Sequence, residues 1–229
     1  MKKLAFTLAE VLITLGIIGV VAGMTIPTLS YNYKEKQNSV KLQHTYSTLK
    51  NAMATAIAEN VNSGVKTVNN MTQMKKWYNT FITPYLNVLQ TCYGAETGCW
   101  AEDTFYARGT KITKNPTGAC GGNTISFVLS DGSFVCIDDY QGDLLDSTFG
   151  VENAVNELSI IFRIDINGNN KPNQYGKDIF IAIFNGNKIV PAGNNRSISE
   201  VNSNCSKNGD GYWCMQKAID SGYKFPLYK

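Results

Sequence analysis

The sequence contains one histidine, His44, among 229 residues, and this scarcity argues against two broad classes of enzyme. Zinc hydrolases and Ser-His-Asp hydrolases use histidine as a metal ligand or as a general base. The chain also has no Walker A, H-E-x-x-H or G-x-S-x-G motif, and no C-x-x-C pair that would suggest metal or redox chemistry. His44 falls beside the apolar stripe of a helical segment, where a surface or packing role is expected. We therefore expect a protein that is not an enzyme.

An excess of charge of one sign is lacking as well. The chain has 21 basic and 18 acidic side chains, and charged residues make up only 17% of it. Proteins that bind nucleic acid through a general basic field are much more basic than this, so no nucleic-acid partner is expected. Hydrophobic residues make up 43% of the chain, enough for a sizeable folded domain with an extension.

One uncharged apolar run stands out at the N-terminus. Residues 11–29 carry no charge and span roughly 28 Å as a helix, close to the thickness of a bilayer core. Lys2 and Lys3 precede the run and favour a cytoplasmic N-terminus. A secretory signal peptide is the alternative. Its apolar region is usually shorter, and here a carboxylate, Glu10, stands at the entrance of the run.

The carboxylate of Glu10 calls for a partner, because a charge within a membrane is costly. No basic residue follows it within one helical turn. A cut between Ala5 and Phe6 would create an α-amino group one turn before Glu10. That amine would then be available to pair with the carboxylate of a neighbouring subunit.

The segment from Ala5 to Ile13 (AFTLAEVLI), followed by Pro27, resembles the N-terminal motif of type IV pilins and type II secretion pseudopilins. In that family a prepilin peptidase removes a short basic leader and N-methylates the new first residue, usually Phe. A glutamate five residues into the mature chain supports assembly. The resemblance places these roles on Phe6 and Glu10, and a helix kink at Pro27. The residue before the cut is usually Gly, and here it is the small Ala5.

The resemblance implies a structural subunit, major or minor, that polymerises through its N-terminal helix into a type IV pilus or a type II secretion pseudopilus. Its partners would be the prepilin peptidase, other pilin or pseudopilin subunits, an inner-membrane assembly platform and membrane lipid. It would cross the cytoplasmic membrane once, with its head outside the cytoplasm, and would end in a surface or periplasm-spanning filament. The alternative is a monomeric, membrane-anchored binding or receptor domain of the cell envelope.

The helical pattern continues beyond the apolar run. Side chains with the spacing of an amphipathic helix follow it: Leu42, Tyr46, Leu49, Met53, Ile57 and Val61. We therefore expect the second half of a long helix to pack on a globular head. The expected divisions are a leader at 1–5, a transmembrane and assembly helix at 6–29, its amphipathic continuation at 30–61, and the head at 62–229.

The head is predicted to be a mixed domain. Residues 71–90 show helical stretches interrupted by Pro84. Strand candidates lie at 124–129, 133–137, 158–164, 178–185 and 188–190. Asp131-Gly132 joins the first two and Gly186-Asn187 joins the last two, both typical of hairpin turns. The expected fold class is α+β and pilin-like, with the long helix covering an antiparallel sheet.

Six cysteines allow fifteen pairings. We favour the pairs that are nearest in sequence. A bond between Cys120 and Cys136 would tie a loop to a hairpin, and one between Cys205 and Cys214 would fix the C-terminal tail. Such bonds require an oxidising compartment, in agreement with a head outside the cytoplasm. Free buried thiols are the alternative. The favoured pairs are Cys92 with Cys99, Cys120 with Cys136, and Cys205 with Cys214.

The loop at 165–178 is rich in oxygen-bearing side chains. Asp165, Asn167 and Asn169 alternate as they do in calcium loops, and Asp178 would close the site, because the twelfth position holds Gly176 instead of Glu. The alternative is a turn whose Asx side chains bond to their own backbone. Major type II secretion pseudopilins often carry calcium in this region, although their motif does not align with this loop residue by residue, so the calcium site and the turn both stay open as interpretations.

Overall fold

The computed structural model describes residues 7–59, 68, 70–112, 120, 122–140, 144–152 and 159–228. It is an α+β structure with a long apolar N-terminal helix, an antiparallel six-stranded sheet and three disulfides. The chain forms two compact units, Met1–Gln37 and Asn38–Lys229, and the boundary between them falls inside the long helix. Each unit is described separately below.

The first unit contains the N-terminal part of helix α1 (Leu8–Glu59). Pro27 lies inside α1, and the helix continues through it. Almost every side chain between Leu8 and Leu29 is exposed, including large apolar ones such as Leu12 and Ile18. Nothing within this unit covers these side chains, so their apolar surface is open to an environment or a partner.

The remainder of α1 belongs to the second unit. The side chains predicted to form the apolar stripe are buried from Leu42 to Met53, and Ile57 packs against the core at its edge. Thr45 extends the same face and donates a hydrogen bond from its hydroxyl to Asp131 Oδ2 (3.0 Å), which ties the helix to the hairpin turn after the second strand. The predicted amphipathic half of the helix is thus confirmed, except at Val61, which lies outside the described residues.

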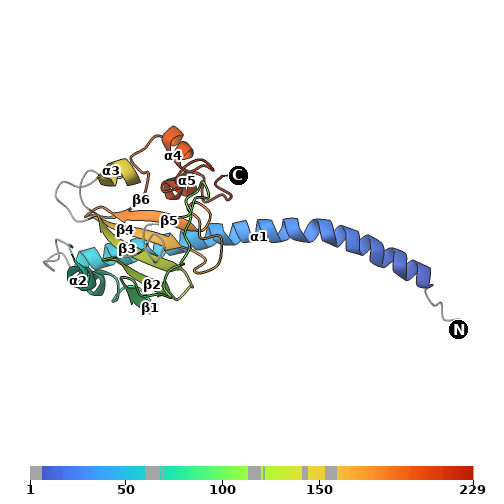
Figure 1. Cartoon of the computed structure of the whole chain (residues 1–229), viewed down its shortest axis with the longest axis horizontal. Coiled ribbons are helices and arrows are strands. Elements are labelled where there is room, and N and C mark those ends of the chain that lie inside the picture. Colours follow the sequence, from blue (N-terminus) through green and yellow to red (C-terminus); the bar gives the residue numbers. More distant parts are fainter. Residues whose placement is uncertain are drawn as a thin grey trace. The chain divides into compact units, whose positions relative to one another are not determined.

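The sheet is a meander in which each strand pairs with the next in antiparallel orientation (Figure 1). The two predicted hairpins are present, joined at Asp131-Gly132 and at Gly186-Asn187. The strands are β1 (Val88–Tyr93), β2 (Ile125–Leu129), β3 (Phe134–Tyr140), β4 (Ser159–Asp165), β5 (Ile179–Phe184) and β6 (Ile189–Pro191).

The prediction for residues 71–90 was wrong in its second half. Helix α2 (Met71–Phe81) ends before Pro84, and the chain then turns into β1, the edge strand of the sheet. The four-residue spacing of aromatic and apolar side chains ran on to Leu89, but Leu89 is exposed on the edge strand. Three short helices were not predicted: α3 (Leu144–Phe149), α4 (Ile198–Asn204) and α5 (Cys214–Asp220).

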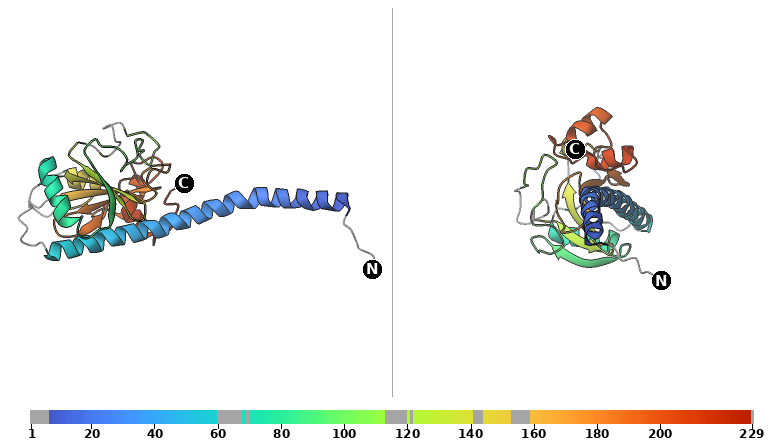
Figure 2. Two further views of the ribbon diagram at one scale, coloured as in Figure 1. Left: turned by 90° about the horizontal axis from the view of Figure 1, so that it is seen from below. Right: turned by 90° about the vertical axis from the view of Figure 1, so that its right-hand side faces the viewer.

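The sheet has an apolar cluster on each face, as strand alternation requires. On one face, side chains such as Phe127 and Phe162 pack with α2 and with the second-unit part of α1, and the rings of Trp77 and Phe162 lie 6.2 Å apart. On the other face, Ile161 and Ile181 pack beneath loops and α3. Figure 2 shows the sheet between these two layers. Loops and short helices therefore carry the surface of the second face.

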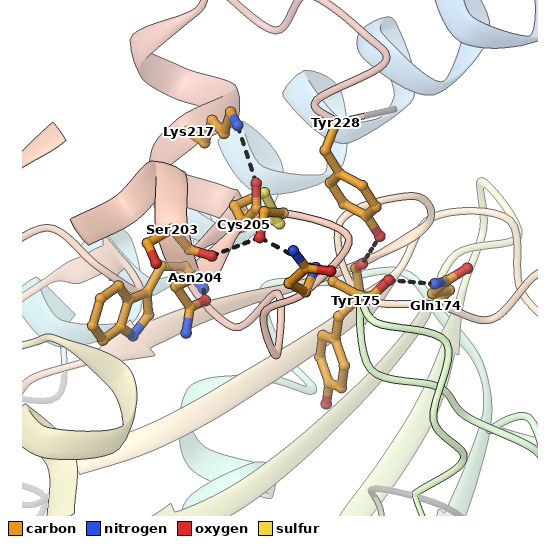
Figure 3. Close-up of a disulfide and its surroundings, with 12 residues drawn as sticks. Gln174, Tyr175, Ser203, Asn204, Cys205, Lys217 and Tyr228 are labelled. Carbon is orange, nitrogen blue, oxygen red and sulfur yellow. Dashed lines mark hydrogen bonds between the residues drawn. A yellow bond between two sulfur atoms is a disulfide. The ribbon is translucent and has the colours of Figure 1, made fainter. Parts of the chain in front are cut away.

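The C-terminal tail contributes to the apolar cluster on the first face of the sheet, and Figure 3 shows its polar contacts. The disulfide between Cys205 and Cys214 joins α4 to α5, and Lys217 Nζ donates to the carbonyl oxygen of Cys205 at 3.0 Å. Tyr228 donates its hydroxyl proton to the carbonyl oxygen of Tyr175 at 2.6 Å. The tail thus holds the end of the loop that precedes β5.

Candidate functional site

The first candidate site is the start of α1, where Glu10 has a partner in its own chain. The backbone N–H and the hydroxyl of Thr7 both donate to Glu10 Oε2 at 2.8 Å, and the N–H of Glu10 donates to Thr7 Oγ1 at 3.3 Å. This reciprocal pairing is a capping box, in which an N-cap residue and the third helical residue satisfy each other's free N–H groups. The Thr-x-x-Glu spacing could have predicted it.

Glu10 is nevertheless exposed, as is the apolar helix that follows it. Within the described residues, α1 is the one helix long and apolar enough to cross a membrane, although a signal sequence near an N-terminus has the same length and composition. Ala5 and Phe6, the predicted cleavage and methylation site, lie outside the described residues.

All six cysteines are paired as predicted. The Cα atoms of the pairs lie 5.9, 6.2 and 4.9 Å apart, within the usual range for disulfides. Cys92–Cys99 closes a loop after β1, Cys120–Cys136 ties a loop to β3, and Cys205–Cys214 fixes the tail.

The second candidate site is the loop between β4 and β5, where Asp178 is an acceptor for several donors. Its Oδ2 accepts from the backbone N–H of Asn173 (2.8 Å) and from Asn167 Nδ2 (3.1 Å), and its Oδ1 accepts from the N–H of Gln174 (2.6 Å). Asp165 Oδ1 likewise accepts from the N–H of Asn167 at 3.1 Å. These contacts are the ones that an Asx-rich turn predicts.

The turn does not use all the oxygens of this loop. Asp165 Oδ2, Asn167 Oδ1 and Asn173 Oδ1 are buried and have no hydrogen-bond partner among the described residues. An unpaired buried acceptor is costly, and three in one loop are unusual. We define these three atoms as the unpaired oxygens of the loop. Oxygen atoms of carboxylates and amides are the ligands that calcium prefers.

The electrostatics of the loop also favour a cation. Asp165 and Asp178 are both fully buried. Burial, together with the charge of Asp178, raises the pKa of Asp165 well above its usual range. Backbone hydrogen bonds from Asn167 and Gly168 and the positive charge of Lys41 offset this only in part. Burial raises the pKa of Asp178 to about 6, although its hydrogen bonds act in the opposite direction. A bound cation would offset the free-energy cost of burying two negatively charged carboxylates close together.

The structure changes the set of residues that could hold a metal ion. Asn169 is exposed, whereas Asn173, which the sequence analysis did not name, contributes an unpaired oxygen. Asn173 has a positive φ of 50°, a backbone conformation that Asn tolerates better than most residues. The position of Asn173 directly after Pro172 in an Asn-rich loop is the feature of the sequence that could have identified it as a candidate ligand. Among the described residues no three His, Cys, Asp or Glu side chains cluster, so amide oxygens would have to share the coordination.

Two glycines allow the loop to lie close to its neighbours. Gly168 has a φ of 64°, and a Cβ there would lie 3.0 Å from the carbonyl oxygen of Gly132 in the β2–β3 turn. Gly176 has a φ of 80°, and a Cβ there would overlap Cys214 and Tyr228. The loop is therefore held between a hairpin turn and the disulfide-linked tail.

Compared with known proteins, the chain matches no protein-family model, no curated protein and no solved structure.

Proposed function

We propose that the chain is a structural subunit that polymerises through its N-terminal helix into a type IV pilus or a type II secretion pseudopilus. The observation that carries this proposal is the exposed apolar segment of α1 with Glu10 near its start. The likeness of residues 5–13 to the pilin motif supports the same assignment. Assembly would consist of helices leaving lipid and packing against one another.

The physical basis of this proposal is that the exposed apolar surface of α1 is equally suited to lipid and to contact with neighbouring helices. Exposed side chains such as Leu12, Ile18 and Leu29 would cost free energy in water, at about 25 cal/mol per Å² of apolar surface. Lipid before assembly, or neighbouring helices after it, would remove that cost. Because apolar contacts are not directional, a charged pair between the amine of Phe6 and Glu10 of a neighbour would set the axial register.

The head has properties that fit a position outside the cytoplasm. Three disulfides persist only in an oxidising compartment. The two lysines before the apolar run favour a cytoplasmic N-terminus, and the helix would then cross the cytoplasmic membrane once. The prepilin peptidase, an inner-membrane assembly platform and other subunits would then be its partners.

Calcium bound in the loop is part of the proposal. The unpaired oxygens of Asp165, Asn167 and Asn173 would be its side-chain ligands, and Asp178 would position the loop through its three accepted hydrogen bonds. The ion would neutralise two buried carboxylates and stabilise the head. Its role would be structural, with no chemical step.

The alternative function is that of a monomeric domain anchored in the envelope. One observation favours it, a cavity of about 600 Å³ on the head, within the usual range for small-molecule sites. A monomeric anchor would use α1 only for attachment and would need Glu10 only as a cap for the start of that helix.

Electron microscopy of sheared surface material and immunodetection of the chain test the two functions. A structural subunit should appear in fibres and should sediment with them, and part of it should remain in the membrane pool. A chain found solely in the membrane pool, and as a monomer after detergent extraction, would exclude polymerisation and leave the anchored domain.

A further inference from the structure

The second layer of the head contains a cavity that the proposed polymerisation does not use, and one of its lining residues, Asn173, also belongs to the proposed calcium site. Its volume is about 600 Å³. We call it the Trp100 cavity. Its floor and walls combine two aromatic rings with polar side chains, and its principal lining residues are Trp100, Glu102, Asp103, Phe134, Asn169 and Lys171.

The walls of the Trp100 cavity are held in place by covalent and backbone links. Thr97 and Gly98, which also line it, lie inside the loop closed by the Cys92–Cys99 disulfide, and Trp100 follows that disulfide directly. The N–H of Phe105 donates to the carbonyl oxygen of Asn173 at 2.9 Å and joins two of the walls. A site built in this way loses little conformational entropy when a ligand binds.

Trp100 supplies a donor that has no acceptor. Its Nε1–H is buried and unpaired among the described residues, and 6% of the side chain is exposed. Indole nitrogen is a donor only, so the missing partner is an acceptor such as a carbonyl oxygen. Phe134 is partly exposed and offers an apolar ring surface on another wall.

The charges around the cavity balance. Glu102 and Asp103 are acidic and Lys171 is basic, and Asp103 forms an ion pair with Lys111. Two negative and two positive groups leave no net field to select a polyanion or a polycation. The exposed carboxylate of Glu102 and amide of Asn169 instead suit hydroxyl groups, which both donate and accept.

We propose that the Trp100 cavity binds a neutral glycan that carries N-acetyl groups. The acetamido carbonyl would accept the indole N–H of Trp100 after a small shift of that buried side chain, and the C–H face of the sugar ring would pack on Phe134. The hydroxyl groups would bond to Glu102 and Asn169. The ligand class follows from one unpaired donor, aromatic walls, polar rims and zero net charge.

Isothermal titration calorimetry of the full chain tests this proposal, in micelles of a detergent that has no sugar headgroup. The probe is chitotriose, a β-linked oligomer of N-acetylglucosamine, and the matched control ligand is maltotriose, which lacks the acetamido group. We expect saturable binding of chitotriose with a Kd of roughly 0.1–1 mM and at least about tenfold weaker binding of maltotriose. Assembly into fibres is not needed, so the result is independent of the proposed function.

Variants locate the site. Trp100→Phe keeps an aromatic ring but removes the donor, and it should weaken chitotriose binding about tenfold. Glu102→Gln changes an exposed side chain without loss of folding and should weaken binding severalfold. Glu152→Gln, also exposed and outside the cavity, is its matched control and should leave the Kd unchanged. Melting temperatures verify that each variant is folded.

Three results would overturn the proposal. The first is a parent chain that binds no chitotriose at millimolar concentration. The second is equal affinity for chitotriose and maltotriose, which would remove the role of the acetamido group. The third is binding that neither Trp100→Phe nor Glu102→Gln weakens, which would place the ligand elsewhere.

Discussion

The hydroxyl and the backbone N–H of Thr7 donate to the same carboxylate oxygen of Glu10, each at 2.8 Å. Glu10 therefore has a local task, because it caps the start of α1. A capping contact contributes about 1 kcal/mol to a helix, far less than assembly of a filament requires. The observed capping by Glu10 and its proposed role in assembly can be separated by experiment.

Glu10→Ala should leave insertion into the membrane intact, since it removes a polar group from the entrance of an apolar helix. We expect it to lower the ratio of sheared-fibre to membrane-pool protein about tenfold or more, because the proposed charged pair with the amine of Phe6 could not form. Glu10→Gln should be intermediate, since it keeps a hydrogen bond but not the charge. Quantitative immunoblots of the two pools measure the ratio.

Thr7→Val is the matched control for capping. It removes the hydroxyl from the capping box but keeps the carboxylate of Glu10 and its charge. Fibre yield should stay close to that of the parent chain. If Thr7→Val lowered the yield as much as Glu10→Ala, capping alone would explain the effect of the glutamate, and the proposed pair between Glu10 and the amine of Phe6 would be contradicted.

Processing gives a second prediction. The mature chain should begin at Phe6 with a methylated amine, because only a cut before Phe6 creates an amine one turn ahead of Glu10. Mass spectrometry of N-terminal peptides from membrane and fibre fractions measures this directly. A mature chain that begins at Met1, or one that begins at Gly23 after ordinary signal cleavage, would contradict the pilin assignment.

Most of the head architecture could be predicted from local patterns. The hairpin turns at Asp131-Gly132 and Gly186-Asn187 require backbone conformations that Gly, Asn and Asp adopt most easily. These dipeptides therefore identified the strands on either side of each turn, β2 with β3 and β5 with β6. β1 was missed because an edge strand has one open side, and its side chains need not alternate strictly. The chance four-residue spacing that ends at Leu89 then favoured a helix.

The candidate metal site in the loop between β4 and β5 could be predicted only in part from the sequence. Asp165, Asn167 and Asp178 were found by their spacing, but spacing did not show which oxygen of each side chain remains unpaired. Asn173 was missed because its role depends on a left-handed backbone after Pro172 and on the fold of the loop around Asp178. Hydrogen bonds of this kind depend on how the folded chain brings distant residues together, and sequence spacing does not show this.

The cation gives the third prediction. The parent chain should melt about 5–11 °C higher in calcium than in chelator, since a ligand present at 100 times its Kd adds about 2.7 kcal/mol. Asp165→Asn should abolish this difference. In chelator the same variant should melt higher than the parent, because it removes a buried carboxylate whose pKa is raised. Differential scanning calorimetry in both buffers measures all four values.

Two further variants test the roles within the loop. Asp178→Ala should lower the melting temperature in calcium and in chelator alike, since three donors lose their acceptor. Asn169→Ala changes an exposed side chain and should retain the calcium difference. A parent chain with equal melting temperatures in the two buffers would leave the loop as an Asx-rich turn without metal.

The fourth prediction is a reversed pH dependence of the metal-free head. Asp178 has a pKa of about 6 in the folded chain and near 4 when unfolded, so at pH 5 the folded state binds more protons. Stability therefore rises as pH falls from 7.5 to 5, by about 1.4 kcal/mol from Asp178 alone. Asp165, whose pKa is also raised, acts in the same direction.

Between pH 7.5 and pH 5, the stabilisation from Asp165 and Asp178 is separated from carboxylates whose lowered pKa makes the folded state less stable on acidification. Asp131 has a lowered pKa, so its stabilising contribution is lost only at pH values below about 4. Thermal melts of chelator-dialysed protein at pH 7.5 and pH 5 should show a rise of about 3–5 °C on acidification. Asp165→Asn should reduce the rise, and calcium should abolish it, because the ion competes with protons for the same carboxylates. A metal-free parent chain that loses stability between pH 7.5 and pH 5 would show that the two buried aspartates do not govern the stability of the head.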